Sequence, residues 1–330
     1  MATYTRFSPD DVVITTEKVF TSTWTNNTNE LTTVYTSSTQ ADFTSPTSSG
    51  QYYIEVYNAD SSLSTSEVQY SISYGHKAGS GSEDINTGAD GLNSSRAIYS
   101  QYRSLVYGDE TRNFSFNGTT PDDIIIINVN RARYKQSLRL GSLNLAIGTT
   151  NLTDDSLTRS GSAVLTNAGR QYNIVSGSSG IMSGSNLSQT DSGSYGLFYP
   201  DAGFIILNGG AVNDSSGLNI ALTRSNTEAK NHETVLDEFT SFELDTQENI
   251  SSQFYFVRAK NKDFNYTTNA SFIDSNGNLN FTSMVDNPVT YITTVGLYND
   301  ANELLAVAKL SQPITKDFTK EALIKVKLDY

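Results

Sequence analysis

Short stretches in which apolar and polar residues alternate recur along this chain of 330 residues. In the clearest of them Val68, Tyr70, Ile72 and Tyr74 share one face, with polar residues between them. A period of two with one apolar face is typical of a half-buried β-strand. Tyr and Phe, which favour sheets, number 19 and 15. The sequence therefore predicts a mainly β protein of antiparallel β-sandwich domains with one or two short helices.

Comparable patterns predict further strands at 12–16, 31–35, 51–57, 124–129, 138–147, 172–175, 254–257 and 324–330. The run Ile124–Ile127 is apolar on both faces, which favours a central strand covered on both sides. Apolar runs around a Pro-Asp turn predict a hairpin over 195–207, and a second hairpin is expected over 291–310. The Asn276-Gly277 pair predicts another hairpin turn.

Two helices are expected between these strands. The first begins near Ser94, ends by Gly108 and should bury Ile98, Tyr102 and Leu105. The second covers 227–242, where Val235, Phe239 and Phe242 have helical spacing. Residues 130–135 should continue the preceding strand, and 176–184 should form a long surface loop.

A stretch rich in Gly and Ser at residues 79–92 is expected to act as a hinge. It divides the chain into a β-sandwich-like N-terminal domain, residues 1–78, and a larger β-rich domain, residues 93–330, that ends in a meander of hairpins. Two domains also agree with the chain length.

Charge and composition exclude several classes of function. The net charge is -13, which disfavours nucleic acid and anionic membrane as partners. The chain has no Cys, so disulfides, thiolate metal sites and Cys nucleophiles are excluded. No signal peptide is recognisable, and the longest apolar run, Ile124–Ile127, is far too short to span a membrane.

No catalytic or metal-binding pattern stands out. Neither a Gly-x-Ser-x-Gly motif nor a phosphate-binding glycine pattern is present. His76 and His232 are isolated and are expected to be solvated surface residues.

The acidic residues are more typical of turns than of catalytic or calcium-binding sites. The pairs Asp122-Asp123 and Asp154-Asp155 are interpreted as solvated carboxylates, since neighbours on a strand point to opposite faces. Asp274–Asn278 resembles the start of a calcium loop, but Val285 stands where a Glu ligand would be. We therefore expect a protein that is not an enzyme and has no cofactor and no metal.

One basic cluster interrupts this acidic chain and consists of Arg131, Arg133, Lys135 and Arg139. On a strand, the first three would share a face and could clamp acidic residues of a neighbouring subunit. The other interpretation is a solvated strand end whose cations protect a sheet edge. The cluster is the candidate partner interface.

Several segments carry a resemblance to a known group of proteins. They are Phe256–Tyr266, Val289–Asp300, Glu303–Leu310, Lys320–Val326, Tyr195–Asp201 and Ile126–Leu145. These segments resemble virion structural proteins of large contractile-tailed bacteriophages, the cyanophage type among them. The resemblance covers roughly residues 93–330; the first 90 or so match no known group. It implies location in the virion and carries no mechanism and no functional residue.

These observations predict a non-catalytic structural subunit of a tailed-phage virion, in the tail, the baseplate or the neck. It would be assembled in the host cytoplasm and act as an adaptor through β edges and loops. Its expected partners are other virion proteins and copies of itself. One alternative is a receptor- or glycan-binding adhesin at the tail tip, in which Trp24 and exposed Tyr residues stack on host sugars. Another is a capsid decoration protein.

Overall fold

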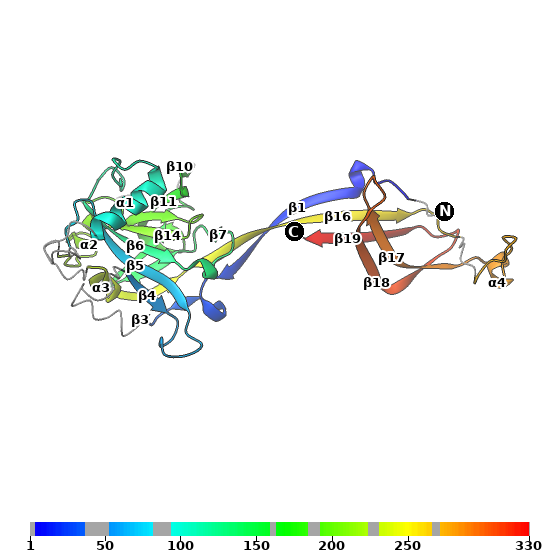
Figure 1. Cartoon of the computed structure of the whole chain (residues 1–330), viewed down its shortest axis with the longest axis horizontal. Helices are drawn as coiled ribbons and strands as arrows, with labels where there is room; N and C mark the ends of the chain where they lie inside the picture. The colour runs from blue at the N-terminus through cyan, green and yellow to red at the C-terminus, as the bar shows by residue number, and fades with distance from the viewer. Residues whose placement is uncertain are drawn as a thin grey trace. The chain divides into compact units, whose positions relative to one another are not determined.

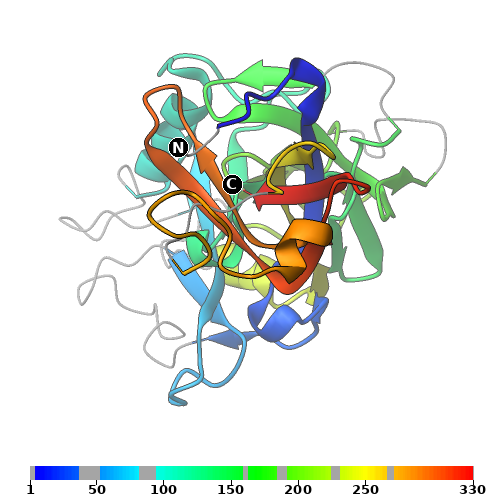
Figure 2. The same ribbon diagram turned by 90° about the vertical axis from the view of Figure 1, so that its right-hand side faces the viewer.

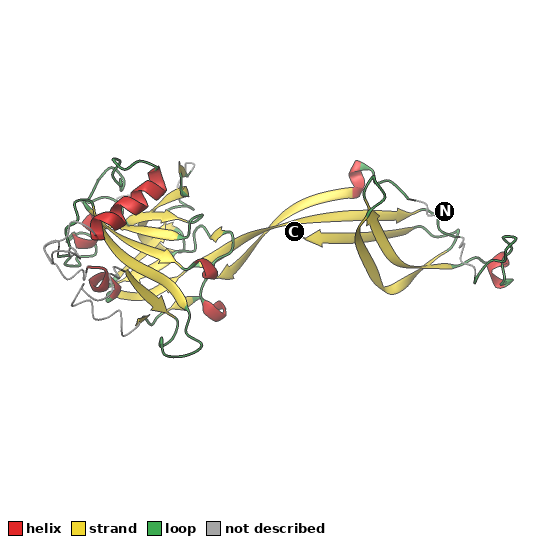
Figure 3. Cartoon of the chain, viewed as in Figure 1, coloured by secondary structure: helices red, strands yellow, loops and turns green. Residues whose placement is uncertain are grey.

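The computed structural model describes residues 4–36, 53–81, 94–158, 163–183, 192–223, 231–265 and 271–329. Within these ranges the protein is mainly β, with antiparallel sheets and four α-helices (Figure 3). It contains two compact units. Unit 1 comprises Met1–Glu17 and Asn249–Tyr330, and unit 2 comprises Lys18–Glu248. The chain passes between the units within strands β1 (Val12–Ser22) and β16 (Asp245–Ala259).

Unit 2 is built on a sheet of thirteen strands (Figure 1). In sheet order, its main path consists of β2 (Glu30–Leu31), β15 (Phe239–Glu243), β8 (Asn144–Ile147), β9 (Thr150–Asp154), β11 (Gly169–Ser178), β13 (Gly196–Tyr199), β14 (Phe204–Asn208), β6 (Asp123–Val129), β5 (Val68–His76), β4 (Tyr53–Tyr57) and β3 (Tyr35–Thr36). Strands β10 (Val164–Thr166) and β12 (Ile181–Met182) pair with β11. A further short strand, β7 (Ser137–Leu138), pairs with β16.

Strand β6 lies between β14 and β5 and is buried on both faces. Its isoleucines alternate between two hydrophobic cores: Ile125 and Ile127 belong to the first, and Ile124 and Ile126 to the second. All four side chains are fully buried. The central, doubly covered strand predicted from the isoleucine run is confirmed.

The first core lies where distant strands of the sheet meet. Tyr70 on β5 has its ring centroid 6.4 Å from that of Phe239 and 5.3 Å from that of Phe242, both on β15. Strand β15 is second from one end of the sheet order, and β5 is third from the other. The sheet therefore curls, so that its two ends face each other across this core.

The second core is covered by helix α1 (Ser94–Tyr107), which ends before Gly108. Gly108 has a φ of 65°, a left-handed conformation that commonly ends helices. Tyr99 and Val106 are the fully buried apolar residues of the helix, whereas Leu105 is 49% exposed. The helix was predicted correctly, and Ile98 and Tyr102 pack against this core as the spacing suggested, whereas Leu105 does not. Two short helices, α2 (Gly209–Asn213) and α3 (Asn231–Leu236), complete unit 2.

Unit 1 packs a hairpin against a sheet. The sheet has the order β1-β16-β19, and the hairpin consists of β17 (Thr290–Tyr298) and β18 (Leu304–Lys316), with β19 at Ala322–Asp329. Figure 2 looks onto this unit, with the hairpin in orange and β19 in red. Its core is thin, since Val295, Leu297, Ile324 and Val326 each remain 7% exposed. The unit also contains the short helix α4 (Ser283–Asp286).

The units differ from the predicted domains. Strands β4 and β5, assigned to a separate N-terminal domain, belong to the same sheet as β6. The hydrogen-bonded pairing of β5 with β6 runs from Tyr70 to His76, so the chain has no domain boundary near residue 78. Of the predicted hinge at 79–92, residues 82–92 lie outside the described part of the chain.

Several local predictions were also wrong. Residues 131–133 form a 3-10 helix instead of a strand. Residues 176–183 are part of the β11–β12 hairpin, with Ser178 opposite Ile181, instead of a loop. Helix α3 ends at Leu236, because Phe239–Glu243 pairs with β8 as a strand. The first residues of that predicted helix, 227–230, lie outside the described ranges.

Both longer hairpins are confirmed, with Tyr199 opposite Phe204 in one and Tyr298 opposite Leu304 in the other. At Asn276-Gly277 the structure has a turn closed by a single bridge between Ile273 and Leu279. Gly277 has a φ of 83°, which explains the glycine there.

We predict that Ile126→Ala lowers the free energy of unfolding of unit 2 by about 2–5 kcal/mol, because it leaves a cavity in a fully covered strand. Leu165→Ala is the control and should change it by less than about 0.5 kcal/mol, since Leu165 is 80% exposed. Urea unfolding followed by tryptophan fluorescence measures both. Similar losses in the two variants would contradict the double burial of β6.

Candidate functional site

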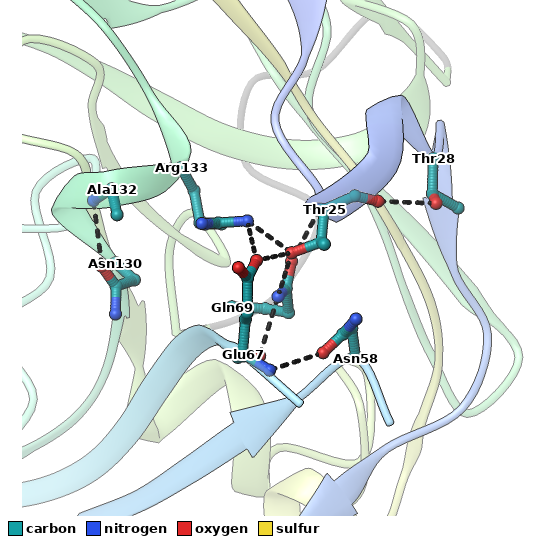
Figure 4. A network of polar contacts seen from close by, with 8 residues as sticks. All are labelled: Thr25, Thr28, Asn58, Glu67, Gln69, Asn130, Ala132 and Arg133. Atoms are coloured by element: carbon teal, nitrogen blue, oxygen red, sulfur yellow. Dashed lines mark hydrogen bonds and ion pairs between the residues drawn. The ribbon is translucent and has the colours of Figure 1, made fainter. Parts of the chain in front are cut away.

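The basic cluster proposed as a partner interface is engaged within unit 2. Figure 4 shows Arg133 directed at Glu67 and Thr25. Its guanidinium donates to a Glu67 carboxylate oxygen at 2.8 Å and to the Thr25 hydroxyl. Thr25 in turn donates to Glu67 at 2.8 Å, and Gln69 donates to Thr25 at 2.7 Å. These hydrogen bonds and the Arg133 charge lower the pKa of Glu67. The network ties the turn after β1 to the start of β5.

The other three cations also have contacts inside unit 2. Arg131 donates to the Tyr134 carbonyl at 2.5 Å and lies over the Tyr134 ring. Lys135 pairs with Glu248 at 2.5 Å. Arg139 pairs with Asp245 at 2.8 Å and lies over Phe20. The predicted common face does not form, because residues 131–133 are helical, and a neighbouring subunit would have to compete with these contacts.

Arg133→Met should lower the free energy of unfolding by about 1–3 kcal/mol, because Glu67 and Thr25 lose a charged donor in a partly buried network. Lys135→Met is the matched control. We expect it to cost less than about 1 kcal/mol, because the Lys135 side chain is 63% exposed and makes a single ion pair. Chemical denaturation compares the two, and an equal cost would show that the Arg133 network has no special structural role.

Trp24 is not available to a ligand. Its side chain is 2% exposed, and its indole nitrogen donates to the Phe242 carbonyl at 2.7 Å. Its ring contacts those of Phe242 and Tyr70 in the first core. The expectation that Trp24 stacks on sugars is therefore wrong.

Both histidines are buried, in contrast to the predicted surface positions. The Nδ1 atom of His76 accepts hydrogen bonds from the backbone nitrogens of Ala78 and Ser80, at 3.1 and 3.3 Å. His232 lies on α3, and its burial lowers its pKa from 6.5 to about 4. Both side chains therefore belong to the interior of unit 2.

The pKa of His232 makes stability depend on pH. In the unfolded chain its imidazole takes up a proton below about pH 6.5, whereas in the folded chain it does so only near pH 4. Stability should therefore be fully present above pH 6.5 and fall by about 3 kcal/mol as the pH drops towards 4. His232→Gln should show a smaller fall over the same interval. Denaturant unfolding at several pH values measures this, and identical profiles would contradict the assignment.

Three of the four carboxylates predicted to be solvated are fully buried: Asp123, Asp154 and Asp155. Asp154 accepts from the Gly141 nitrogen at 2.9 Å and from the Ser156 hydroxyl, and burial raises its pKa. Asp155 accepts from the backbone and side-chain nitrogens of Asn173, both at 2.9 Å. Asp154 thus holds the turn before β8, and Asp155 holds the backbone of β11.

The described residues contain no group of three or more His, Asp or Glu side chains that could hold a metal ion. In the loop that resembles a calcium site, Asp274 accepts hydrogen bonds from the backbone of Asn276 and Asn278, both at 2.8 Å. This is the geometry of a turn stabilised by its own first residue.

A cavity of about 300 Å³ in unit 2 lies between α3 and the segment that joins β2 to β3. Thr32, Thr33 and Thr36 line it together with Glu233 and Asp237, over an apolar floor that includes Ile54, Leu236 and Phe239. Hydroxyl and carboxylate groups can hydrogen-bond a small polar ligand such as a sugar. No sequence pattern indicates this cavity, because its walls come from segments about 200 residues apart.

Unit 1 carries an exposed apolar surface that the sequence analysis did not identify. Among the described residues, fourteen of the twenty-three exposed large hydrophobic side chains belong to this smaller unit. We define the hairpin patch as Tyr291, Tyr298, Leu304, Leu305 and Val307 of β17 and β18. A signal was present in 304–308, which is apolar on both faces although the hairpin has only one covered face.

The net charge is concentrated on unit 2, whereas the exposed apolar side chains are concentrated on unit 1. Unit 2 has 24 Asp and Glu against 13 Lys and Arg, whereas unit 1 has 11 against 9. Almost all of the net negative charge is therefore on unit 2. Exposed apolar side chains concentrated on a nearly neutral unit are a feature of protein–protein interfaces.

No family model, curated protein or solved structure matches this chain. In the described ranges, none of the helices is long and apolar enough to cross a membrane.

Proposed function

We propose that this chain is a non-catalytic structural subunit of a larger assembly, in which unit 1 is the part that binds neighbouring subunits. The observation that carries the proposal is the concentration of exposed apolar side chains on unit 1. Monomeric soluble proteins rarely leave large apolar patches in water, so this surface is expected to be covered in the working state. The acidic unit 2 would keep the assembly soluble.

The thin core of unit 1 supports the same proposal. Its most buried aliphatic residues on β17 and β19 still keep 7% of their surface exposed, whereas many core residues of unit 2 have none. Covering the hairpin patch would add apolar burial, at roughly 25 cal/mol for each Å² removed from water. Contact with neighbouring subunits would therefore stabilise unit 1, whereas unit 2 already has a fully buried core.

The assembly we propose is the virion of a tailed bacteriophage, with the chain in the tail, the baseplate or the neck. This assignment depends on the sequence resemblance of residues 93–330 to virion structural proteins. The basic cluster is not the proposed contact, because its cations are engaged within unit 2. Trp24 does not support the glycan-binding alternative, because its side chain is buried. The threonine-lined cavity is the remaining support for that alternative.

We predict that the chain is present in purified particles and that the double variant Leu305→Ser, Val307→Ser is incorporated at least tenfold less. These side chains are 68% and 58% exposed, so the variant should fold normally. Leu165→Ser on unit 2 is the control and should be incorporated like the wild type. Quantitative mass spectrometry of particles assembled with each variant measures this. Absence of the wild-type chain from the particles, or equal incorporation of all three, would overturn the proposal.

A further inference from the structure

We propose that two copies of this chain associate through the free edge of β17, so that their β17–β18 hairpins form one four-stranded antiparallel sheet. The inference rests on the proposed function of unit 1 as the assembling part, and it specifies the partner and the contact. The contact would be an antiparallel pair of identical strands related by a two-fold axis.

One edge of β17 has no partner strand among the described residues. Within the described residues β17 pairs with β18 alone, in a sheet of two strands. Gly296, two residues before the end of the strand, is exposed, and because glycine has no side chain this exposure is that of the backbone. Alternate backbone N–H and C=O groups of β17 are thus free to pair with another strand.

Strand β17 lacks the charged side chains and the prolines that normally protect an edge, although its pairing with β18 shifts register between Ile292 and Thr294 and between Leu297 and Tyr298. Its nine residues, Thr290–Tyr298, include no charge and no Pro, and most are β-branched or aromatic. Lysines, prolines and bulges are the usual means by which proteins prevent pairing at an exposed edge. An uncharged edge of this length is a template for strand addition.

Two other strands of unit 1, β18 and β19, do carry residues that protect an edge. Strand β18 contains Lys309 and Pro313, and its pairing with β17 is interrupted at residues 310–313. Strand β19 carries exposed Lys325 and Lys327, and two-fold pairing centred on Val326 would place these lysines opposite each other. Like charges in directly opposed positions destabilise a sheet.

The electrostatics favour a second copy as the partner. A strand without charges can meet an identical strand without placing like charges together. Copies that met through unit 2 would bring two strongly acidic units into contact, whereas unit 1 is nearly neutral. A two-stranded hairpin is also marginal by itself, and a sheet of four strands with a common apolar face is more stable.

The middle of β17 offers a direct test. Thr294 is exposed and pairs with Lys309 on β18, so its substitution should leave the hairpin intact. In a two-fold pair centred there, the two Thr294 Cα atoms would lie about 4.5–5.5 Å apart, within the range of a disulfide. The chain has no Cys, so Thr294→Cys introduces a unique thiol.

We expect the wild-type chain to sediment at about twice its mass of 36.0 kDa and Thr294→Lys to sediment as a monomer. Thr294→Cys should form a disulfide-linked dimer under mild oxidation. Gln312→Lys and Gln312→Cys, at an exposed position of β18, are the controls: the first should still dimerise and the second should not cross-link. Circular dichroism should be unchanged in all four variants, whereas Thr294→Lys should unfold at a lower temperature than the wild type because it lacks the stabilisation by the second copy.

A monomeric wild-type chain, or a dimer that persists in Thr294→Lys, would overturn the β17 pairing. If such a chain is nevertheless incorporated into particles, the proposed function stands without this contact. A chain that dimerises through β17 but is absent from the particles supports the pairing and overturns the proposed function. The two measurements therefore separate the two proposals.

Discussion

The burial of β6 on both faces is the constraint on which the structure of unit 2 depends. A strand with no exposed apolar face needs a covering layer on each side and a paired strand along each edge. Helix α1 supplies one layer, and the curled sheet supplies the other by bringing β15 opposite β5. The edges are occupied by β5 and β14. The same arrangement explains why Asp123, at the start of the strand, is buried as well.

Unit 1 is organised by a different balance of forces. It closes its own core only partly and leaves apolar side chains on the outer face of its hairpin. Unit 2 combines a dry interior with most of the negative charge of the chain. This separation of apolar surface from charge gives one chain two properties that a subunit of an assembly needs, an adhesive part and a soluble part.

The sequence predicted the strands well wherever periodicity and turn chemistry acted locally. The isoleucine run, the Pro-Asp hairpin and the final meander are all present as expected. It failed where long-range pairing decides the outcome. Phe239 and Phe242 have helical spacing but lie on a strand, because β8 offers them a partner. The domain boundary was misplaced for the same reason. Strands β5 and β6 pair with each other, although the predicted hinge lies between them in the sequence.

The candidate sites were predicted less well than the fold. Histidines and paired aspartates were interpreted as surface groups because such residues are usually exposed. His76 is buried with hydrogen bonds from the backbone nitrogens of the turn that follows it, whereas Asp155 is buried with hydrogen bonds from Asn173, which lies on another strand. No local pattern encodes such partners. The hairpin patch was also missed, although a local signal was present: residues 304–308 are apolar on both faces, and the hairpin covers only one of them.

The most direct test of this account is a cryo-electron microscopy reconstruction of the intact particle at side-chain resolution. The account predicts that density for unit 1 lies against neighbouring polypeptides, with the hairpin patch covered, and that unit 2 keeps most of its surface in solvent. A reconstruction in which the hairpin patch faces solvent while unit 2 makes the contacts would contradict it.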